Sequence, residues 1–452
     1  MSTKEKRSQE EIEMQILREL KEEIMELERQ GKLYKFETAL DNAMAKFKKA
    51  IEETTEETLE KIKEKSDLKK NRCPRCGREM RINNYNTNIR VLTKHGWYHV
   101  PVDTCFCRYC HKGFVPLEEK LGLIEEHKIT KEMADLMTYA GQMATSFEKA
   151  SELIEKFTGI EVSESLIRSV TEETGEKVFK QDMARAEESY KKPEIAAPYA
   201  LERHKKEGVL YIFTDGSTVN TTMKEENGSS WREMKLGLVF WDGDSISRKD
   251  GKKIITKKEY VPFFGGVEEF KKLLFDAAAR AGYGKIRQVV VIGDGSHWIW
   301  NMCNELFPDA VQILDYYHLS ENVHAFARYL YPDNEVKMKG WANNILDKID
   351  KGLVDEVLGS LPELKEVKLP AQVPNLKVYI ENNRGRIDYR RYRLRGYCIG
   401  SGAIESGHKL VIHQRMKQSG MRWSIPGGQY VAALRAKYAS NQWDKVRSVI
   451  GL

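Results

Sequence analysis

Two runs of β-forming residues each end in an aspartate followed by glycine, and these aspartates are the first candidates for chemistry. One run extends from Val209 to Asp215 and the other from Val289 to Asp294. If the runs form neighbouring strands, both carboxylates lie at one rim of a sheet, where they repel each other unless a cation lies between them. Carboxylate oxygens bind hard divalent cations. The sequence therefore predicts a site for Mg²⁺ or Mn²⁺ at Asp215 and Asp294.

Glu405 is the candidate for a third metal-binding acid. It follows the Gly- and Ser-rich stretch Gly400-Ser-Gly-Ala-Ile404 and enters a helical pattern. The stretch between Asp294 and Glu405 is too long for a loop in a compact domain, and it carries helical periodicity. We therefore expect an α-helical insertion over residues 319–396, and three acids around two Mg²⁺ ions.

Five of the seven cysteines lie in one short segment, where they predict a metal site of a second kind. The pairs Cys73-x-x-Cys76 and Cys107-x-x-Cys110 lie on either side of a predicted β-hairpin. Two such pairs at the ends of a hairpin form the tetrahedral thiolate site of a zinc ribbon. Cys105 could replace Cys107 as a ligand, and the weaker alternatives are His99 and His111. We expect one structural Zn²⁺.

Length and composition limit the class of protein. A chain of 452 residues is long enough for two to four domains. Its 41% hydrophobic and 31% charged residues are typical of a globular protein, and no apolar run is long enough to cross a bilayer. We expect a cytoplasmic protein in which Cys303 and Cys398 are small buried residues. The net charge of +6 does not by itself indicate a nucleic-acid partner.

Composition and periodicity divide the chain into successive segments. Residues 1–70 are amphipathic and helical, 71–118 form the zinc ribbon, and 119–190 are again helical. Within the last segment, a helix from Phe147, a turn with Gly159 and an N-cap at Ser163 predict a helix-turn-helix that binds DNA, or else an ordinary helical hairpin. A Pro-containing linker near Pro193 precedes the main domain, residues 201–452.

The main domain is predicted to be α/β. From Val209 onward the pattern gives three strands, a helix, a strand, a helix and a strand. This order is typical of the ribonuclease H-like fold, in which the first and fourth strands are neighbours. That arrangement brings Asp215 and Asp294 together.

These residues also carry a resemblance to a known family. The chain resembles bacterial insertion-sequence transposases of the Asp-Asp-Glu class, in particular the Kra group. The cysteine segment resembles the N-terminal zinc module of that group. The other matching stretches are Thr214-Asp-Gly-Ser217, Trp231 to Phe240, Gly293 to Trp300, Ile313 to His318, Ile399 to Ser406 and Gln414 to Ser424. The resemblance extends from about Cys73 to Trp443. It implies that Asp215, Asp294 and Glu405 are the catalytic acids and that the activity is metal-dependent DNA cleavage and strand transfer.

The same resemblance makes Asp315-x-x-His318 similar to an Asp/Cys-x-x-His motif of related transposases with helical insertions. We expect Asp315 and His318 to share a hydrogen bond that fixes the insertion against the sheet, and His408 to share the face of the Glu405 helix. Trp298 could stack on an unpaired base, although packing in the core is the more frequent role of such a residue.

Basic residues concentrate around Glu405 and predict a track for DNA phosphates. A solvated basic surface is the alternative interpretation. The predicted DNA-binding residues are Arg384, Arg386, Arg390, Arg391, Arg393, Arg395, Lys409, Arg415, Lys417 and Arg422. Double-stranded DNA is the expected partner, and joining two DNA ends implies a homodimer or larger assembly. The competing functions are a ribonuclease H-like nuclease or resolvase without strand transfer, and a transposase-derived DNA-binding protein.

Overall fold

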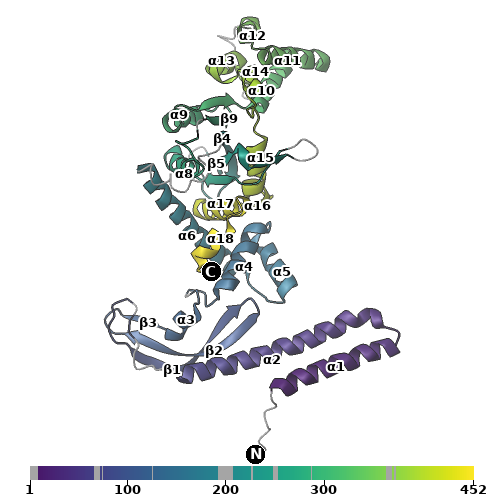
Figure 1. Ribbon diagram of the computed structural model, residues 1–452, viewed down its shortest axis with the longest axis vertical. Coiled ribbons are helices and arrows are strands. Elements are labelled where there is room, and N and C mark those ends of the chain that lie inside the picture. Colours follow the sequence, from purple (N-terminus) through teal and green to yellow (C-terminus); the bar gives the residue numbers. More distant parts are fainter. Residues whose placement is uncertain are drawn as a thin grey trace, which may run out of the picture. The chain divides into compact units, whose positions relative to one another are not determined.

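The structure is a computed structural model, and it describes residues 9–65, 72–73, 75–124, 126–191, 207–224, 228–247, 253–286, 288–362, 369–370 and 373–452. The chain divides into two compact units (Figure 1): Met1–Leu136 with Thr158–Ile160, and Met137–Phe157 with Glu161–Leu452. No helix among these described residues is both long enough and apolar enough to cross a membrane.

The first unit begins with a pair of long helices, as the amphipathic pattern predicts. Helices α1 (Gln9–Arg29) and α2 (Phe36–Lys65) pack against each other around the 3₁₀ turn η1 (Leu33–Lys35). Ile16 is buried between them, and Lys46 of α2 pairs with Glu19 of α1 at 2.6 Å.

A three-stranded antiparallel sheet completes this unit. Its order is β1–β2–β3, and the turn between β1 and β2 pairs Thr93 with Gly96, which confirms the predicted hairpin. A small apolar core that includes Val91 and Val100 lies on this sheet, beside the short helix α3 (Pro116–Leu121). The strands are β1 (Arg81–Thr93), β2 (Gly96–Cys107) and β3 (Lys112–Phe114).

Three helices precede the strands of the main sheet in the sequence: α4 (Lys131–Met143), α5 (Phe147–Thr158) and α6 (Glu164–Lys191). The predicted N-cap is present, because Ser163 Oγ accepts the backbone N–H of Leu166 at 3.3 Å. However, α6 packs along much of its length against helices of the second unit, where Val170 and Val178 are buried. Helix α6 belongs to the same compact unit as the main sheet, and the part of the predicted linker after Lys191 lies outside the described residues.

The second unit is built on a mixed five-stranded sheet of order β10–β9–β4–β5–β8. Strands β4, β5 and β8 pair antiparallel as a meander, whereas β9 runs parallel to β4 and β10 runs parallel to β9. The protein is therefore a mixed α/β protein. The strands are β4 (Val209–Asn220), β5 (Trp231–Trp241), β8 (Glu259–Phe263), β9 (Gln288–Gly293) and β10 (Val311–Leu314); a separate hairpin consists of β6 (Ser245–Ser247) and β7 (Lys253–Ile255), after the 3₁₀ turn η4 (Asp242–Asp244).

Helices cover both faces of this sheet (Figure 1). A Cβ on Gly237 of β5 would meet Leu274 of α8 (Val267–Arg280), so α8 covers the face toward which Gly237 points. A Cβ on Gly407 of α15 (Gly402–Gly407) would meet Leu236 of β5, so α15 covers the opposite face. The remaining helices of this unit are α9 (His297–Leu306), α17 (Ile425–Ala439) and α18 (Trp443–Ile450).

Helical segments fill the chain between β10 and α15, which is where the sequence predicts an insertion. They are α10 (Tyr316–Leu330), α11 (Glu335–Asp350), α12 (Val354–Ser360), α13 (Leu376–Asn382), the 3₁₀ turn η5 (Arg384–Arg386) and α14 (Tyr389–Leu394). Tyr389 of α14 is fully buried, and its hydroxyl donates to the carbonyl of Leu314 on β10 at 3.0 Å. This contact anchors the insertion to the edge strand of the sheet.

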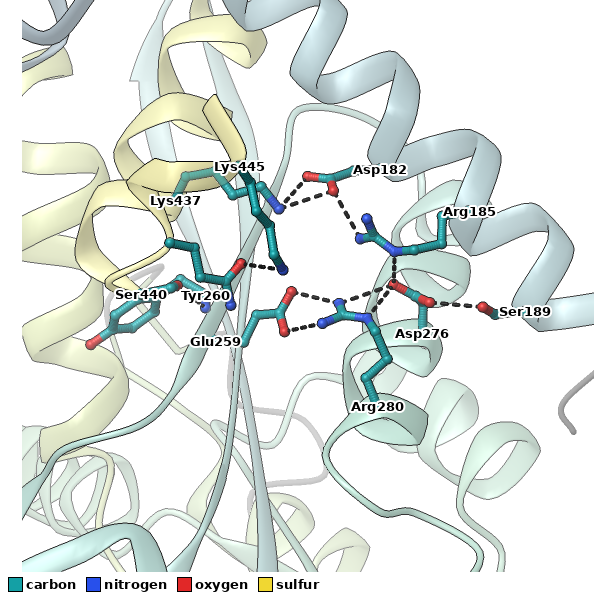
Figure 2. Close-up of polar contacts among 11 residues, drawn as sticks. Asp182, Arg185, Ser189, Glu259, Tyr260, Asp276, Arg280, Lys437, Ser440 and Lys445 are labelled. Atoms are coloured by element: carbon teal, nitrogen blue, oxygen red, sulfur yellow. Dashed lines mark hydrogen bonds and ion pairs between the residues drawn. The ribbon is translucent and has the colours of Figure 1, made fainter. Parts of the chain in front are cut away.

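A network of charged side chains connects α6 through α8 to β8, the edge strand opposite β10 (Figure 2). Arg280 of α8 binds both carboxylate oxygens of Glu259 on β8 at 2.5 Å, and it also pairs with Asp276, which accepts a hydrogen bond from Arg185 of α6. Burial would raise the pKa of Glu259, but the guanidinium of Arg280 holds that pKa well below its usual range. Breaking one partner of such a pair leaves a buried charge uncompensated, so the network holds α6 in a single position.

Candidate functional site

Three aspartates occupy one row across neighbouring parallel strands. The strand register pairs Phe213 of β4 with Ile292 of β9, and Ile292 with Ile313 of β10. Two residues further along the chain are Asp215, which lies within β4, and Asp294 and Asp315, which directly follow β9 and β10. Because side chains two residues apart point to the same face of a sheet, the register directs these acids to the face that α15 covers. This register is consistent with the expectation that Asp215 and Asp294 lie near each other, which stays a prediction.

Asp215 is held from two sides. Its Oδ1 accepts the backbone N–H of Gly216 at 2.7 Å, and its Oδ2 lies 3.1 Å from Nε2 of His408. Burial would raise the pKa of Asp215, but the imidazole of His408 outweighs burial and lowers it. The carboxylate is therefore kept ionised, which a cation ligand requires.

Asp294 is positioned by the turn that follows β9. Its Oδ1 accepts the backbone N–H of Ser296 at 2.8 Å, and its Oδ2 accepts the hydroxyl of Ser296 at 3.0 Å. Gly295 has φ +100°, and a Cβ there would lie 3.1 Å from the ring of Tyr379 in α13. The hydroxyl of Tyr379 donates to the carbonyl of Asp294 at 3.0 Å. The helical insertion thus packs directly on the turn that carries Asp294.

Ser401 connects Asp315 to Glu405. Its backbone N–H donates to Oδ1 of Asp315 at 2.9 Å, and its hydroxyl donates to Oε1 of Glu405 at 2.6 Å. Asp315 is fully buried, and burial raises its pKa. His318 Nε2 lies 3.6 Å from Oδ2 of Asp315, which is too long for the hydrogen bond that the sequence predicts. Instead, Asp315 caps α10 through the N–H of Tyr317 and holds the segment that leads to Glu405.

Glu405 lies on α15, which packs against β4 and β5, and its side chain is exposed. The oxygens of Asp215, Asp294 and Glu405 do not gather within 4.8 Å of one another. A single ion would require such a cluster, whereas two ions about 4 Å apart, each about 2 Å from its ligands, spread their outer ligands over roughly 8 Å. These acids supply oxygen ligands suited to hard divalent cations, and each carboxylate keeps lone pairs beyond those already used.

Sequence reasoning did not find His413 and Ser217, which extend this site. Residues His408–His413 form a π-helical turn between α15 and α16 (Gln414–Met416). The rings of His408 and His413 stack with centroids 5.8 Å apart, and Nε2 of His413 lies 3.0 Å from Oγ of Ser217. Lys417 also donates to Ser217, at 2.7 Å. The five-residue spacing of the histidines was the available signal, because a π-helical turn brings residues i and i+5 together, and such turns are frequent at functional sites.

Trp298 packs against helix α8. Its ring packs edge-on against Phe270 of α8, with Nζ of Lys235 5.1 Å from the ring centroid. These contacts favour packing on α8 for the ring, and stacking of the half-buried Trp298 on DNA stays a prediction. Packing in the core, the alternative interpretation, accounts for its position.

The predicted basic track is only partly at the surface. Arg415 is 1% exposed and donates to the carbonyls of Gly141 and Thr145, at 3.1 and 3.2 Å, so its assignment to DNA binding is wrong. Arg386 is half-buried against the ring of Trp300. Arg384 and Arg393 are exposed but pair with acids of the insertion. The other predicted residues are also exposed: Arg390, Arg391, Arg395, Lys409, Lys417 and Arg422.

The four predicted cysteines form a second cluster, in the first unit. Sγ of Cys73 lies 3.9 Å from Sγ of Cys110, and Sγ of Cys76 lies 3.6 Å from Sγ of Cys107. Four sulfurs about 2.3 Å from a tetrahedral Zn²⁺ are about 3.8 Å apart. The backbone N–H of Cys110 lowers the pKa of Cys107 to about 7, as a thiolate ligand requires. The cluster has the ligands and spacing of a structural zinc site.

Backbone geometry explains why the two Cys-x-x-Cys pairs form equivalent knuckles. Gly77 follows the first pair with φ +69°, and His111 follows the second with φ +51°. Each left-handed residue turns the chain after the second ligand. Cys105 is buried and lies outside the cluster, so the open choice between the two ligands is settled in favour of Cys107.

The two isolated cysteines differ in exposure. Cys303 is fully buried, as the sequence predicts, and burial raises its pKa to about 12. Cys398 is exposed, so the expectation that it is a core residue is wrong. Its backbone N–H donates to the hydroxyl of Tyr211 at 3.2 Å, which places it where the insertion returns to the sheet.

Comparison with known proteins assigns the chain to a family. The "UPF0236 protein in vanSb 3'region" of Streptococcus gallolyticus is 22% identical over 332 residues. The aligned part covers 72% of this chain and 66% of that relative, which is just under two thirds of its length. Residues 36–449 match the family described as "Uncharacterised protein family (UPF0236)", a match that includes the cysteine cluster and all three acids. The chain therefore belongs to the UPF0236 family.

Proposed function

We propose that this protein is a DNA transposase of the Asp-Asp-Glu class, which cuts DNA at the ends of an insertion sequence and joins those ends to a target. The observation that carries the proposal is the parallel pairing of β4, which contains Asp215, with β9, which Asp294 directly follows, together with the contact between β4 and the helix of Glu405. The motifs that resemble the Kra group of transposases include these residues.

The sheet supports the finer assignment to the ribonuclease H-like fold. The five strands of this sheet follow one another in the chain as β4, β5, β8, β9 and β10. Numbered one to five in that order, they lie side by side as 3-2-1-4-5. In that fold the first and fourth strands supply two of the acids. The helical segments between β10 and α15 correspond to the proposed insertion, whose end returns Glu405 to the sheet.

The reaction is an in-line displacement at phosphorus. In the first step a water oxygen bonds to phosphorus, the bond from phosphorus to the 3′ oxygen breaks, and that oxygen leaves as a 3′-OH. In the second step this hydroxyl attacks a target phosphodiester and displaces another 3′ oxygen. Two Mg²⁺ or Mn²⁺ ions, when bound, supply charge stabilisation for the attacking and leaving oxygens.

The residues of the chain have separate tasks in this proposal. Asp215, Asp294 and Glu405 hold the ions. His408 positions Asp215, to which it is 3.1 Å away, and Ser401 positions Glu405 through a 2.6 Å hydrogen bond. Exposed arginines of α14, together with Lys409, Lys417 and Arg422, bind DNA phosphates and align the strand. Two copies of the protein act together, because two DNA ends are joined.

The test uses DNA that carries the genomic sequence flanking the gene, incubated with the protein and Mg²⁺. We expect cleaved and joined products with the wild type, and a loss of at least a thousandfold with Asp215→Asn, Asp294→Asn and Glu405→Gln, since each removes a charged ligand. Asp333→Asn is the matched control, because Asp333 is exposed in a turn of the insertion.

The outcomes separate the candidate functions. Cleavage without joining, lost in the same variants, would replace the transposase with a nuclease or resolvase. DNA binding without any cleavage in Mg²⁺ or Mn²⁺ would instead indicate a DNA-binding protein that has lost the chemistry.

A further inference from the structure

An aromatic cavity of about 540 Å³ lies on the face of the main sheet that carries the acids. Its floor is formed by rings of Tyr211 and Phe213 on β4 and of Phe240 on β5. Phe240 is stacked on Tyr211 at 5.3 Å and on Phe213 at 5.8 Å between centroids. This size is within the range of sites that hold a small ligand or a single nucleotide.

Tyr317 forms the wall on the side of the helical insertion. Tyr317 is 58% exposed, although it lines the cavity together with Tyr316. The backbone at Gly400 lies against this ring, since a Cβ there would be 2.5 Å from it. A large aromatic side chain held at a cavity mouth with more than half of its surface in water is available to stack on a flat ligand.

One exposed arginine lines the cavity, and three more lie on or just after the same helix. Arg393 lines the cavity, where its guanidinium lies 5.3 Å from the ring centroid of Tyr316 and pairs with Asp350. Arg390 and Arg391 on the same helix, and Arg395 at its end, are exposed. Asp242 and Ser245 add polar groups to the lining. Exposed arginines beside an aromatic pocket are the combination that single-stranded nucleic acid requires, because phosphates bind the arginines while bases stack on the rings.

The cavity adjoins the acids along three elements. Phe213 precedes Asp215 by two residues on the same face of β4, a separation of about 7 Å. Ala403 lines the cavity two residues before Glu405, and Tyr317 lines it two residues after Asp315. A nucleotide whose phosphate lay at the acids could therefore place a neighbouring base in the cavity.

We propose that this cavity binds an unstacked base of the DNA strand next to the phosphate that reacts. The proposal rests on the transposase function proposed above, and it identifies the ligand as single-stranded DNA recognised through the face of a base. Withdrawing one base from the stack would open the duplex beside the acids, and stacking on Tyr317 would offset the cost of that opening.

The test compares two probes for binding to the Asp294→Asn protein, in which cutting is prevented. One probe is oligothymidylate of about 12 nucleotides, and the other has the same sugar-phosphate backbone without bases. We expect tighter binding of oligothymidylate by roughly tenfold, a preference that Tyr317→Ala removes and Tyr317→Phe retains. Tyr329→Ala, which removes an exposed tyrosine at the far end of α10, is expected to leave the preference intact.

Cys398 provides a second measurement inside the cavity. It is the exposed cysteine outside the four-cysteine cluster among the described residues, and it lines the cavity. Oligothymidylate should slow alkylation of Cys398 by iodoacetamide in the zinc-loaded protein, while the backbone without bases should slow it much less. Peptide mass spectrometry reads the modified site, and Cys398→Ser controls for alkylation elsewhere.

The inference is overturned if Tyr317→Ala weakens both probes equally or neither, or if neither probe protects Cys398. Its failure is distinguishable from failure of the proposed function. Strand joining with no preference for bases removes only the cavity proposal. A preference for bases without cleavage in the wild type removes the transposase, and with it the reacting phosphate, but leaves base binding in the cavity.

Discussion

Nε2 of His408 lies 3.1 Å from Oδ2 of Asp215, although the two residues are 193 positions apart in the sequence. His408 is 4% exposed, and the π-helical turn that it begins directs it toward the sheet. A buried imidazole beside a carboxylate fixes the orientation of that carboxylate and keeps it ionised. The contact therefore connects the helix of Glu405 to the first acid of the site.

Replacing His408 tests this positioning role. We expect His408→Ala to weaken Mn²⁺ binding and strand joining by roughly 10- to 100-fold, the usual cost of losing a group that orients a metal ligand. His408→Gln should retain more of both, because an amide N–H can still donate to Asp215. Titration calorimetry with Mn²⁺ measures the affinity, and His324→Ala on α10 is the control. Equal losses in both His408 variants with an intact fold would contradict the role.

The four-cysteine cluster predicts one tightly bound Zn²⁺ per chain. We expect Cys76→Ser or Cys107→Ser to reduce the zinc content to near zero and to loosen the β1–β2–β3 sheet, because a structural zinc site contributes directly to folding. The control is Cys105→Ser, the same substitution at a cysteine two residues before Cys107, and it should keep the full zinc content. Elemental analysis and protease sensitivity provide the measurements. Zinc retained in Cys107→Ser but lost in Cys105→Ser would show that the ligand assignment is wrong.

The arginines should divide into two classes by their burial. Arg391→Ala removes an exposed charge, so we expect weaker DNA binding and a plot of log affinity against log salt that is shallower by about 1. Arg415→Met removes buried hydrogen bonds to Gly141 and Thr145, and each carbonyl left unpaired costs about 1–3 kcal/mol of unfolding free energy. Its salt dependence should not change. A shallower slope for Arg415→Met would restore its role in DNA binding.

The position of His413 predicts a dependence of stability on pH. Burial, with a smaller effect of Lys417, lowers the pKa of His413 to about 4, below the ordinary value of about 6.5. Between these values the unfolded chain binds a proton that the folded protein does not, so stability falls as the pH decreases from about 6.5 to about 4.

Chemical denaturation of the wild type and His413→Gln over this pH range measures that dependence. The curves of stability against pH for the wild type and His413→Gln should differ mainly at pH values above those at which most carboxylates titrate. The control His324→Gln should give the same curve as the wild type. Parallel curves for the wild type and His413→Gln would show that His413 is readily protonated in the folded protein.

Several features could be predicted from sequence because they depend on residues close together in the chain. The two β-forming runs that end in Asp215 and Asp294, and the paired Cys-x-x-Cys spacings, are local patterns with one common geometric outcome. The hairpin at Gly96 is local in the same sense. Parallel pairing of the strands then places the acids in one row, since side chains alternate between the faces of a sheet.

Other features were decided only by tertiary structure, because burial depends on contacts between distant segments. A basic residue looks the same in sequence whether it faces solvent or two backbone carbonyls, so Arg415 was assigned to the surface although Gly141 and Thr145 enclose it. The sequence left the role of Trp298 open between stacking on a base and packing, and only the fold brings its ring into contact with Phe270 of α8. His413 acquires its place beside Ser217 from a π-helical turn, whose formation depends on packing that no local pattern records.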